Sequence, residues 1–346
     1  MRYIPGMNQT KTPIWLLVAT VSLAASSFAA VSFAAVSFAA ASFVADGSIA
    51  AAPPRADTTV AIPSPHYIST IVGTLSGGPG RKATRRSTPS WLTVTHPIAL
   101  ADTTLPRLAD FNPADRRQLA LALKHKDIST RVACYAFLQV GTPYELGPLG
   151  EGAPPDTQPV LQFKTTDCTT INLVSAALAH ADELGGEQRA IALANYRGGV
   201  ISYASRFHFT TDRLDASPYF RDITRRAGGK ACRHQVVTLN QRANGSHWIP
   251  IDWTREREVF YVPRERGAEF ERWFHEHRIP PAMGIAFVKA AKLRDGLDVV
   301  HESMLWRGHT LLHASSLSGR VIMLPWRQFL EESGAQYDGF VLFEYR

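Results

Sequence analysis

The sequence predicts an α+β protein with helices at the start of its globular part and an antiparallel sheet at its end. Segments between residues 112 and 185 have the apolar spacing and the terminal residues of helices. From residue 282 onward, short β-prone runs follow one another at intervals of roughly ten residues, with turn residues between them. Helices followed by consecutive strands are typical of the α+β class.

Residues 1–50 have the composition of an export signal. Arg2 and Lys11 precede an apolar run rich in Ala and Ser, with small-residue cleavage candidates in SLAASS and FVADGSIAA. The run is longer than the apolar core of a usual signal and contains the near-repeat SFAAVSFAAVSFAAASF, so an uncleaved membrane anchor is the alternative. We expect an exported bacterial protein, periplasmic or extracellular, which is membrane-tethered only if this segment is retained.

Residues 51–105 are rich in Pro, Gly, Ser and Thr, which predicts a flexible linker before a domain spanning residues 106–346. The net charge of the whole chain is +7. This balance suits an exported protein that meets anionic cell-wall polymers, and it equally suits a solvated basic surface. Basic and acidic residues are interspersed along the chain, so no nucleic-acid partner is expected.

The first helices are predicted from their ends. Asn112 is a cap residue followed by proline at the first helical position, and Ser129 is the expected cap of a second helix. Asp167 caps a third helix, which ends at Gly185.

Strands are predicted from alternation. Residues 196–210 alternate apolar and polar after a turn, which predicts a strand or hairpin, and QVVTLN and EVFYVP predict two further strands. A helix is expected over residues 267–280, closed by prolines. The C-terminal runs predict a meander: MGIAFVKA, LDVVHESMLW, HTLLHASS, GRVIMLP and DGFVLFEY.

Cys168 directly follows the cap of the third helix. Of the three cysteines, an exported chain leaves at least one unpaired, and we expect this to be Cys168, with Cys134 and Cys232 as a candidate disulfide. Amide donors and the helix dipole at a helix N-terminus favour a thiolate, the form that a covalent nucleophile needs. A small buried residue that packs a helix end is the alternative interpretation.

Two histidines lie twelve residues apart on adjacent predicted strands, His301 and His313. A hairpin brings both imidazoles to one face, where one ring can orient the other as a general base. The other histidine-rich pieces, HEH and KACRH, lack the spacing of zinc ligands, so neither a metal nor an organic cofactor is expected.

The order of these motifs resembles the DUF1460 family of exported, NlpC/P60-like cysteine amidases, known as N-acetylmuramoyl-L-alanine amidase-like. The resemblance covers about residues 112–346 and rests on GTPYELGPLGEG, DCTT, NYRGGVISYASRFHFTTD, FYVPRE, GLDVVH and LLHASSLSGRVIMLP. It implies a papain-like fold in which the helix that carries the nucleophile packs on the C-terminal sheet. It also implies that Cys168 is the nucleophile, that His301 is the base and that His313 orients His301.

The resemblance further implies a set of oxyanion and substrate contacts. Tyr144 matches the tyrosine beside the nucleophile that helps bind the oxyanion. Arg206 matches a segment associated with the substrate cleft, where a guanidinium can pair with a muropeptide carboxylate; an ion pair with Asp212 or another acid is the structural alternative. The full set is Tyr144, Asp167, Ser205, Arg206, His208 and Asp212.

The chain departs from the family pattern in two places. Glu302, Ser303 and Met304 follow the first strand histidine where the family usually has Val-Gly-Ile, and residues 282–287 read AMGIAF in place of the usual S-G-D-I. The first departure puts a carboxylate where a small residue is expected.

The implied function is hydrolysis of an amide in peptidoglycan or its fragments through a thioester, at the bond between N-acetylmuramic acid and L-alanine. A stem-peptide endopeptidase with the same mechanism and a non-catalytic cell-wall-binding protein are the alternatives. We expect a monomer whose partner is peptidoglycan or a muropeptide.

Overall fold

The computed structural model describes residues 107–150, 154–156, 160–276 and 280–346. The predicted leader and linker lie outside these residues. Within the described ranges, no helix combines the length and the apolar character needed to cross a lipid bilayer.

Helices make up most of the described chain before residue 217, as the sequence predicts. The α-helices are α3 (Pro113–Leu123), α4 (Ile128–Phe137), α5 (Thr170–Leu184), α6 (Glu187–Asn195), α7 (Thr210–Ala216), α8 (Thr224–Gly228), α9 (Gly267–Glu276), α10 (Ala290–Arg294) and α11 (Trp326–Glu331). Short 3-10 turns are η3 (Leu108–Asp110), η4 (Arg197–Gly199), η5 (Tyr203–Ser205), η6 (Gly229–Ala231), η7 (Arg264–Arg266) and η8 (Gly334–Gln336).

The strands form one eight-stranded antiparallel sheet. They are β1 (Phe220–Asp222), β2 (Arg233–Leu239), β3 (Arg255–Pro263), β4 (Ala282–Val288), β5 (His301–Trp306), β6 (Thr310–Ser315), β7 (Arg320–Pro325) and β8 (Gly339–Tyr345). Their order is β2-β3-β8-β4-β5-β6-β7, and β1 also pairs with β8.

The predicted C-terminal meander is correct from β4 to β7 but wrong for β8. The last strand returns to the middle of the sheet, where it lies between β3 and β4. Nearly all of its residues are buried, because it has neighbours on both edges and helices nearby. A run that is apolar on both faces, such as GFVLFEY, is typical of such a central strand.

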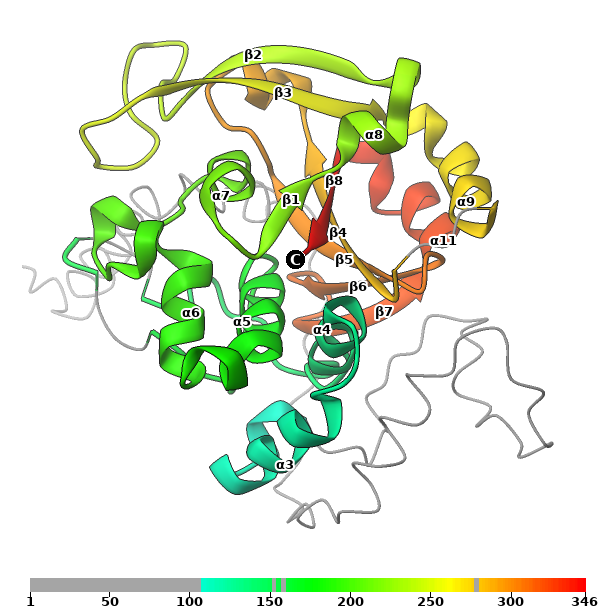
Figure 1. Ribbon diagram of the computed structural model, residues 1–346. Coiled ribbons are helices and arrows are strands. Elements are labelled where there is room, and N and C mark those ends of the chain that lie inside the picture. The colour runs from blue at the N-terminus through cyan, green and yellow to red at the C-terminus, as the bar shows by residue number, and fades with distance from the viewer. Residues whose placement is uncertain (1–106, 151–153, 157–159, 277–279) are drawn as a thin grey trace, which may run out of the picture.

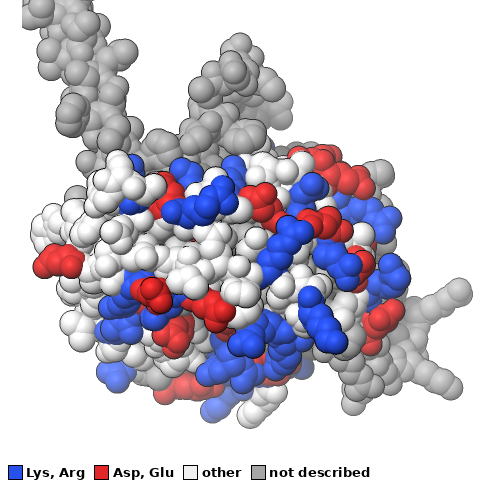
Figure 2. All heavy atoms as spheres, turned by 90° about the horizontal axis from the view of Figure 1, so that it is seen from above, with Lys and Arg blue, Asp and Glu red and all other residues white. Residues whose placement is uncertain are grey.

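Helices cover the sheet on two sides (Figure 1). Helices α4 and α5 lie against one side, and α9 and α11 lie against the other. The β2–β3 hairpin extends over α7 and β1. On the face of the molecule over this hairpin, basic and acidic side chains are interspersed, so neither sign of charge covers it (Figure 2).

Two local predictions are wrong. Asp127, and not Ser129, caps α4: its carboxylate accepts the Thr130 N–H at 2.9 Å. The Ser129 hydroxyl instead bonds the backbone of Ala282 at the start of β4. Residues 196–210 form 3-10 turns joined by a single bridge between Tyr196 and Arg206, and not a strand or hairpin.

Candidate active site

The start of α5 is held by Asp167. One carboxylate oxygen accepts the backbone N–H groups of Thr169 at 3.1 Å and Thr170 at 2.7 Å, and the other accepts the Gly147 N–H at 3.1 Å. The Ile171 N–H bonds the Asp167 carbonyl at 3.2 Å, so Cys168 lies in the turn that leads directly into α5. The N-cap of α5 itself is Thr169, one residue after Cys168. Because the buried Asp167 carboxylate bonds backbone groups, the structure assigns it to the helix start and not to a substrate contact.

Tyr144 lies beside the turn that carries the nucleophile candidate. It forms a parallel bridge with Thr166, and the Glu145 N–H donates to the Thr166 carbonyl at 3.0 Å. These two contacts fix the Tyr144 loop to the residues directly before Cys168, as the sequence predicts. The Tyr144 side chain is half-buried.

The two strand histidines contact each other, as the predicted hairpin requires. His301 Nε2 lies 3.1 Å from His313 Nδ1, and the rings are nearly perpendicular, at 85°. The Ser303 hydroxyl lies 3.2 Å from the same His301 nitrogen. The His301 ring stacks on Phe287 and Tyr337, with centroids 5.9 and 6.2 Å away, which fixes its plane.

Cys168 and His301 line one narrow pocket, together with Phe207, His208 and Asp298. His301 also lines a second pocket, on the side of His313. Within the described residues, no hydrogen bond joins the Cys168 thiol to His301. Proton transfer between them therefore requires a closer approach, and catalytic hydrogen bonds often tighten only when substrate binds.

The expected thiolate is not the resting form of Cys168. Burial and, to a smaller extent, the nearby carboxylates of Asp167 and Glu302 together raise the pKa of the thiol to about 12, against the lowering effect of a hydrogen bond from the Glu302 backbone. Burial also lowers the pKa of His301 to about 4. Desolvation therefore favours the neutral thiol and the neutral imidazole, against the effect of the helix N-terminus.

Glu302, the departure from the family pattern, is buried and lines the same pocket as Cys168. Arg213 Nη2 lies 2.7 and 2.6 Å from its two carboxylate oxygens. The Thr210 hydroxyl donates to it at 2.7 Å, and the Asn172 amide donates at 3.2 Å. This carboxylate therefore joins β5 to the first turns of both α5 and α7.

The other residues predicted to line the substrate cleft lie in different surroundings. His208 lines the Cys168 pocket, with Nε2 2.6 Å from the Tyr203 carbonyl, and burial lowers its pKa to about 4. Ser205 bonds within its own turn, to Ser202 and to the Val200 carbonyl.

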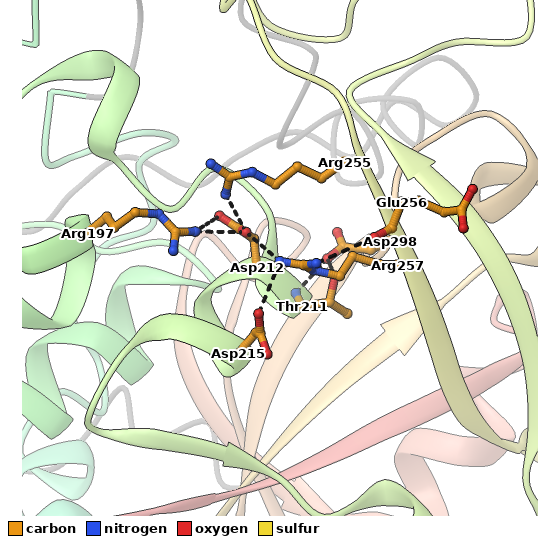
Figure 3. Close-up of polar contacts among 8 residues, drawn as sticks. All are labelled: Arg197, Thr211, Asp212, Asp215, Arg255, Glu256, Arg257 and Asp298. Atoms are coloured by element: carbon orange, nitrogen blue, oxygen red, sulfur yellow. Dashed lines mark hydrogen bonds and ion pairs between the residues drawn. The ribbon is translucent and has the colours of Figure 1, made fainter.

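Arg206 is buried in an ion pair with Asp156 at 2.6 Å, and it also donates to the Leu149 carbonyl and the Tyr196 hydroxyl. Its role is therefore structural, with an acid other than Asp212. Asp212 is buried on the far side of α7, where three other arginines contact it (Figure 3).

Asp298 is a buried carboxyl in the Cys168 pocket that was not predicted from the sequence. It accepts hydrogen bonds from the Thr211 N–H at 2.6 Å and the Thr211 hydroxyl at 2.7 Å. Burial raises its pKa to about 6, against the effect of these bonds. The sequence signal that could have identified this residue is the acid three residues before His301 in GLDVVH.

The remaining cysteines do not form the candidate disulfide, since all three thiols are free. Cys134 is buried in α4, and the Cys232 thiol donates to the Thr224 carbonyl at 3.3 Å. Among the residues that the structure describes, no three His, Cys, Asp or Glu side chains are grouped so as to hold a metal ion.

Comparison with known proteins gives a consistent family. A model of AmiA-like proteins, described as N-acetylmuramoyl-L-alanine amidase-like, matches residues 134–335. A solved structure from Legionella pneumophila, of family DUF1460, is similar with a TM-score of 0.54 and 19% identity, over 67% of this chain and 93% of that one. An N-acetylmuramoyl-L-alanine amidase from Bacteroides uniformis gives 0.50 and 18%, over 63% and 99%. At these identities the two structures show a shared fold. No curated protein matches the sequence significantly.

The raised thiol pKa predicts how alkylation of Cys168 depends on pH. Because only the thiolate reacts, the rate with iodoacetamide should rise about tenfold per pH unit from about pH 7 to about pH 10. Free cysteine, the control, levels off above about pH 8.5. Peptide mapping by mass spectrometry separates Cys168 from the other two thiols, and a plateau for Cys168 below about pH 8 would contradict the assignment.

The buried Arg213–Glu302 pair predicts a large stability effect. Arg213→Met leaves an uncompensated buried carboxylate and should lower the free energy of unfolding by about 3–5 kcal/mol in urea denaturation. Adding Glu302→Gln should recover most of this loss. The control Arg327→Met removes an exposed pair with Glu271 and should cost less than about 1 kcal/mol. A single-variant loss no larger than that of the control would refute the role of the pair.

Proposed function

Since the chain belongs to the AmiA-like family of N-acetylmuramoyl-L-alanine amidase-like proteins, we propose that it is an exported cysteine amidase that acts on peptidoglycan or its fragments. The scissile bond is the amide between the lactyl group of N-acetylmuramic acid and L-alanine. The observation that carries the proposal is the His301–His313 contact at 3.1 Å beside a pocket shared by His301 and Cys168.

The histidine contact supports one arrangement of protons. For His301 Nδ1 to act as the base, its Nε2 must carry the hydrogen and donate it to His313 Nδ1. His313 then accepts through Nδ1 and keeps its own hydrogen on Nε2. This is the orienting role of the third member of a triad, carried out by a neutral ring.

The acylation step begins with a neutral thiol. The Cys168 proton moves to His301 as the sulfur attacks the amide carbonyl, because neither group is ionised beforehand. The Cys168 N–H and the Tyr144 hydroxyl stabilise the oxyanion. The tetrahedral intermediate collapses as His301 protonates the leaving nitrogen, which releases the stem peptide and leaves a thioester on Cys168.

Deacylation reverses the proton movement. His301 takes a proton from water, the hydroxide attacks the thioester carbonyl, and the free acid leaves as the sulfur recovers the proton. The residues that carry both half-reactions come from the turn before α5, from β5 and β6, and from the Tyr144 loop of a single chain, which supports a monomeric enzyme with an NlpC/P60-like, papain-like arrangement. Export is proposed from the composition of residues 1–50.

Incubation of the purified protein with muropeptides tests the reaction. The wild type should release free stem peptide and unsubstituted muramyl sugar, detected by mass spectrometry, while Cys168→Ala should release neither. A shortened stem peptide would instead identify an endopeptidase with the same chemistry. No cleavage by the wild type across a range of muropeptides would indicate a cell-wall-binding protein.

A further inference from the structure

Three arginines converge on one carboxylate beside the candidate active site. Arg197 Nη2 lies 2.9 Å from both oxygens of Asp212, and Arg255 Nη1 lies 2.6 Å from one of them. Arg257 Nη2 lies 3.4 Å from the same oxygen and 3.0 Å from Asp215. Figure 3 shows the three side chains entering from different directions toward Asp212. We call Arg197, Arg255 and Arg257 the arginine cluster.

The cluster is built by strand alternation and ring stacking. Arg255 and Arg257 are two residues apart on β3 and share one face, whereas Glu256 points away (Figure 3). The Arg255 guanidinium lies 4.2 Å from the centre of the Trp253 ring, and that of Arg197 lies 5.4 Å from the centre of Phe207. Stacking on aromatic faces holds guanidinium groups in place before any ligand arrives.

The charges of the cluster are not balanced at the surface. The Asp212 side chain is 2% exposed, while those of Arg197, Arg255 and Arg257 are 42%, 31% and 30% exposed. Asp215, which is 65% exposed, contacts only Arg257 within the cluster. Each guanidinium has five N–H donors in a planar fork, so one buried carboxylate cannot satisfy three of them. N–H donors of these guanidinium groups therefore face solvent, where they can donate to a carboxylate.

Helix α7 connects the cluster to the Cys168 pocket. Thr210 and Arg213 line the pocket, whereas Asp212 contacts the cluster. Phe207 lines the same pocket, and the Arg197 guanidinium lies over its ring. The width of an α-helix with side chains is about 10 Å, and an extended peptide covers that distance in about three residues.

We infer that the arginine cluster binds a carboxylate of the substrate's stem peptide, remote from the scissile amide. The sequence analysis gave this role to Arg206, whose side chain the structure buries against Asp156. The inference rests on the proposed amidase function for the identity of the ligand. It adds a specificity determinant: the cluster selects peptides with free carboxylates over their amidated forms.

Calorimetric titration of the full chain carrying Cys168→Ala tests this selection without consuming the ligand. The two ligands are a muramyl peptide with free carboxylates and the same peptide with its carboxyl groups converted to amides. Because a hydrogen-bonded charge pair is lost, the amidated ligand should bind at least about tenfold more weakly. Arg255→Gln should abolish this preference and leave the affinity for the amidated ligand unchanged.

Two further variants keep the test independent of folding. Arg197→Gln, at the most exposed member of the cluster, should reduce the preference in the same way, and Arg327→Gln, on α11, should keep it in full. A purely structural ion-pair network would shift the melting temperature of the cluster variants without changing the ratio of the two affinities. An unchanged ratio in both cluster variants, or no preference in the Cys168→Ala protein, would overturn the inference.

Different results would overturn the carboxylate subsite and the proposed amidase function. Equal cleavage of both ligands by the wild type would support the amidase and remove the carboxylate subsite. A preference for the free acid that depends on Arg255, without any cleavage by the wild type, would support the subsite and remove the amidase.

Discussion

The buried Arg213–Glu302 ion pair is the interaction on which the candidate site depends. Removing two charges from water costs several kcal/mol for each ion, and this cost is offset only when the remaining hydrogen-bonding capacity is used. Here Thr210 and Asn172 supply those bonds, and Asn172 is itself bonded by the Tyr345 hydroxyl of β8 at 2.7 Å. The start of α5, helix α7 and strand β5 are thereby held around one carboxylate, with the nucleophile and the base candidates beside it.

The same carboxylate affects the chemistry of the pocket. Its charge adds to burial in raising the pKa of the Cys168 thiol, while its backbone bonds the sulfur. The raised pKa of Cys168 and the lowered pKa of His301 both favour the neutral forms, so the proposed attack includes transfer of the thiol proton, as in the serine proteases.

Local signals predicted helices α3, α4, α5 and α9 and the contact between the two histidines. They did not predict which segments far apart in the chain contact one another. The Asn112 cap and the two strands carrying His301 and His313 follow from spacing alone. The strand or hairpin predicted over residues 196–210 is wrong because the alternating apolar residues are buried in turns and do not form a strand ladder. The place of β8 and the partners of Arg206 and Asp212 depend on which segments meet in space, which no local pattern encodes. The sequence shows Glu302 as a departure from the family pattern, but it does not show that Arg213 is its ion-pair partner.

The proposed mechanism requires that an acyl group becomes attached to Cys168. The most direct measurement is the intact mass of the protein after rapid acid quenching of a reaction with a muropeptide. We expect an adduct with the mass of the muramyl acyl group, located on Cys168 by peptide mapping and absent from Cys168→Ala. An adduct that persists in Cys168→Ala, or release of stem peptide by Cys168→Ala at the wild-type rate, would contradict this mechanism.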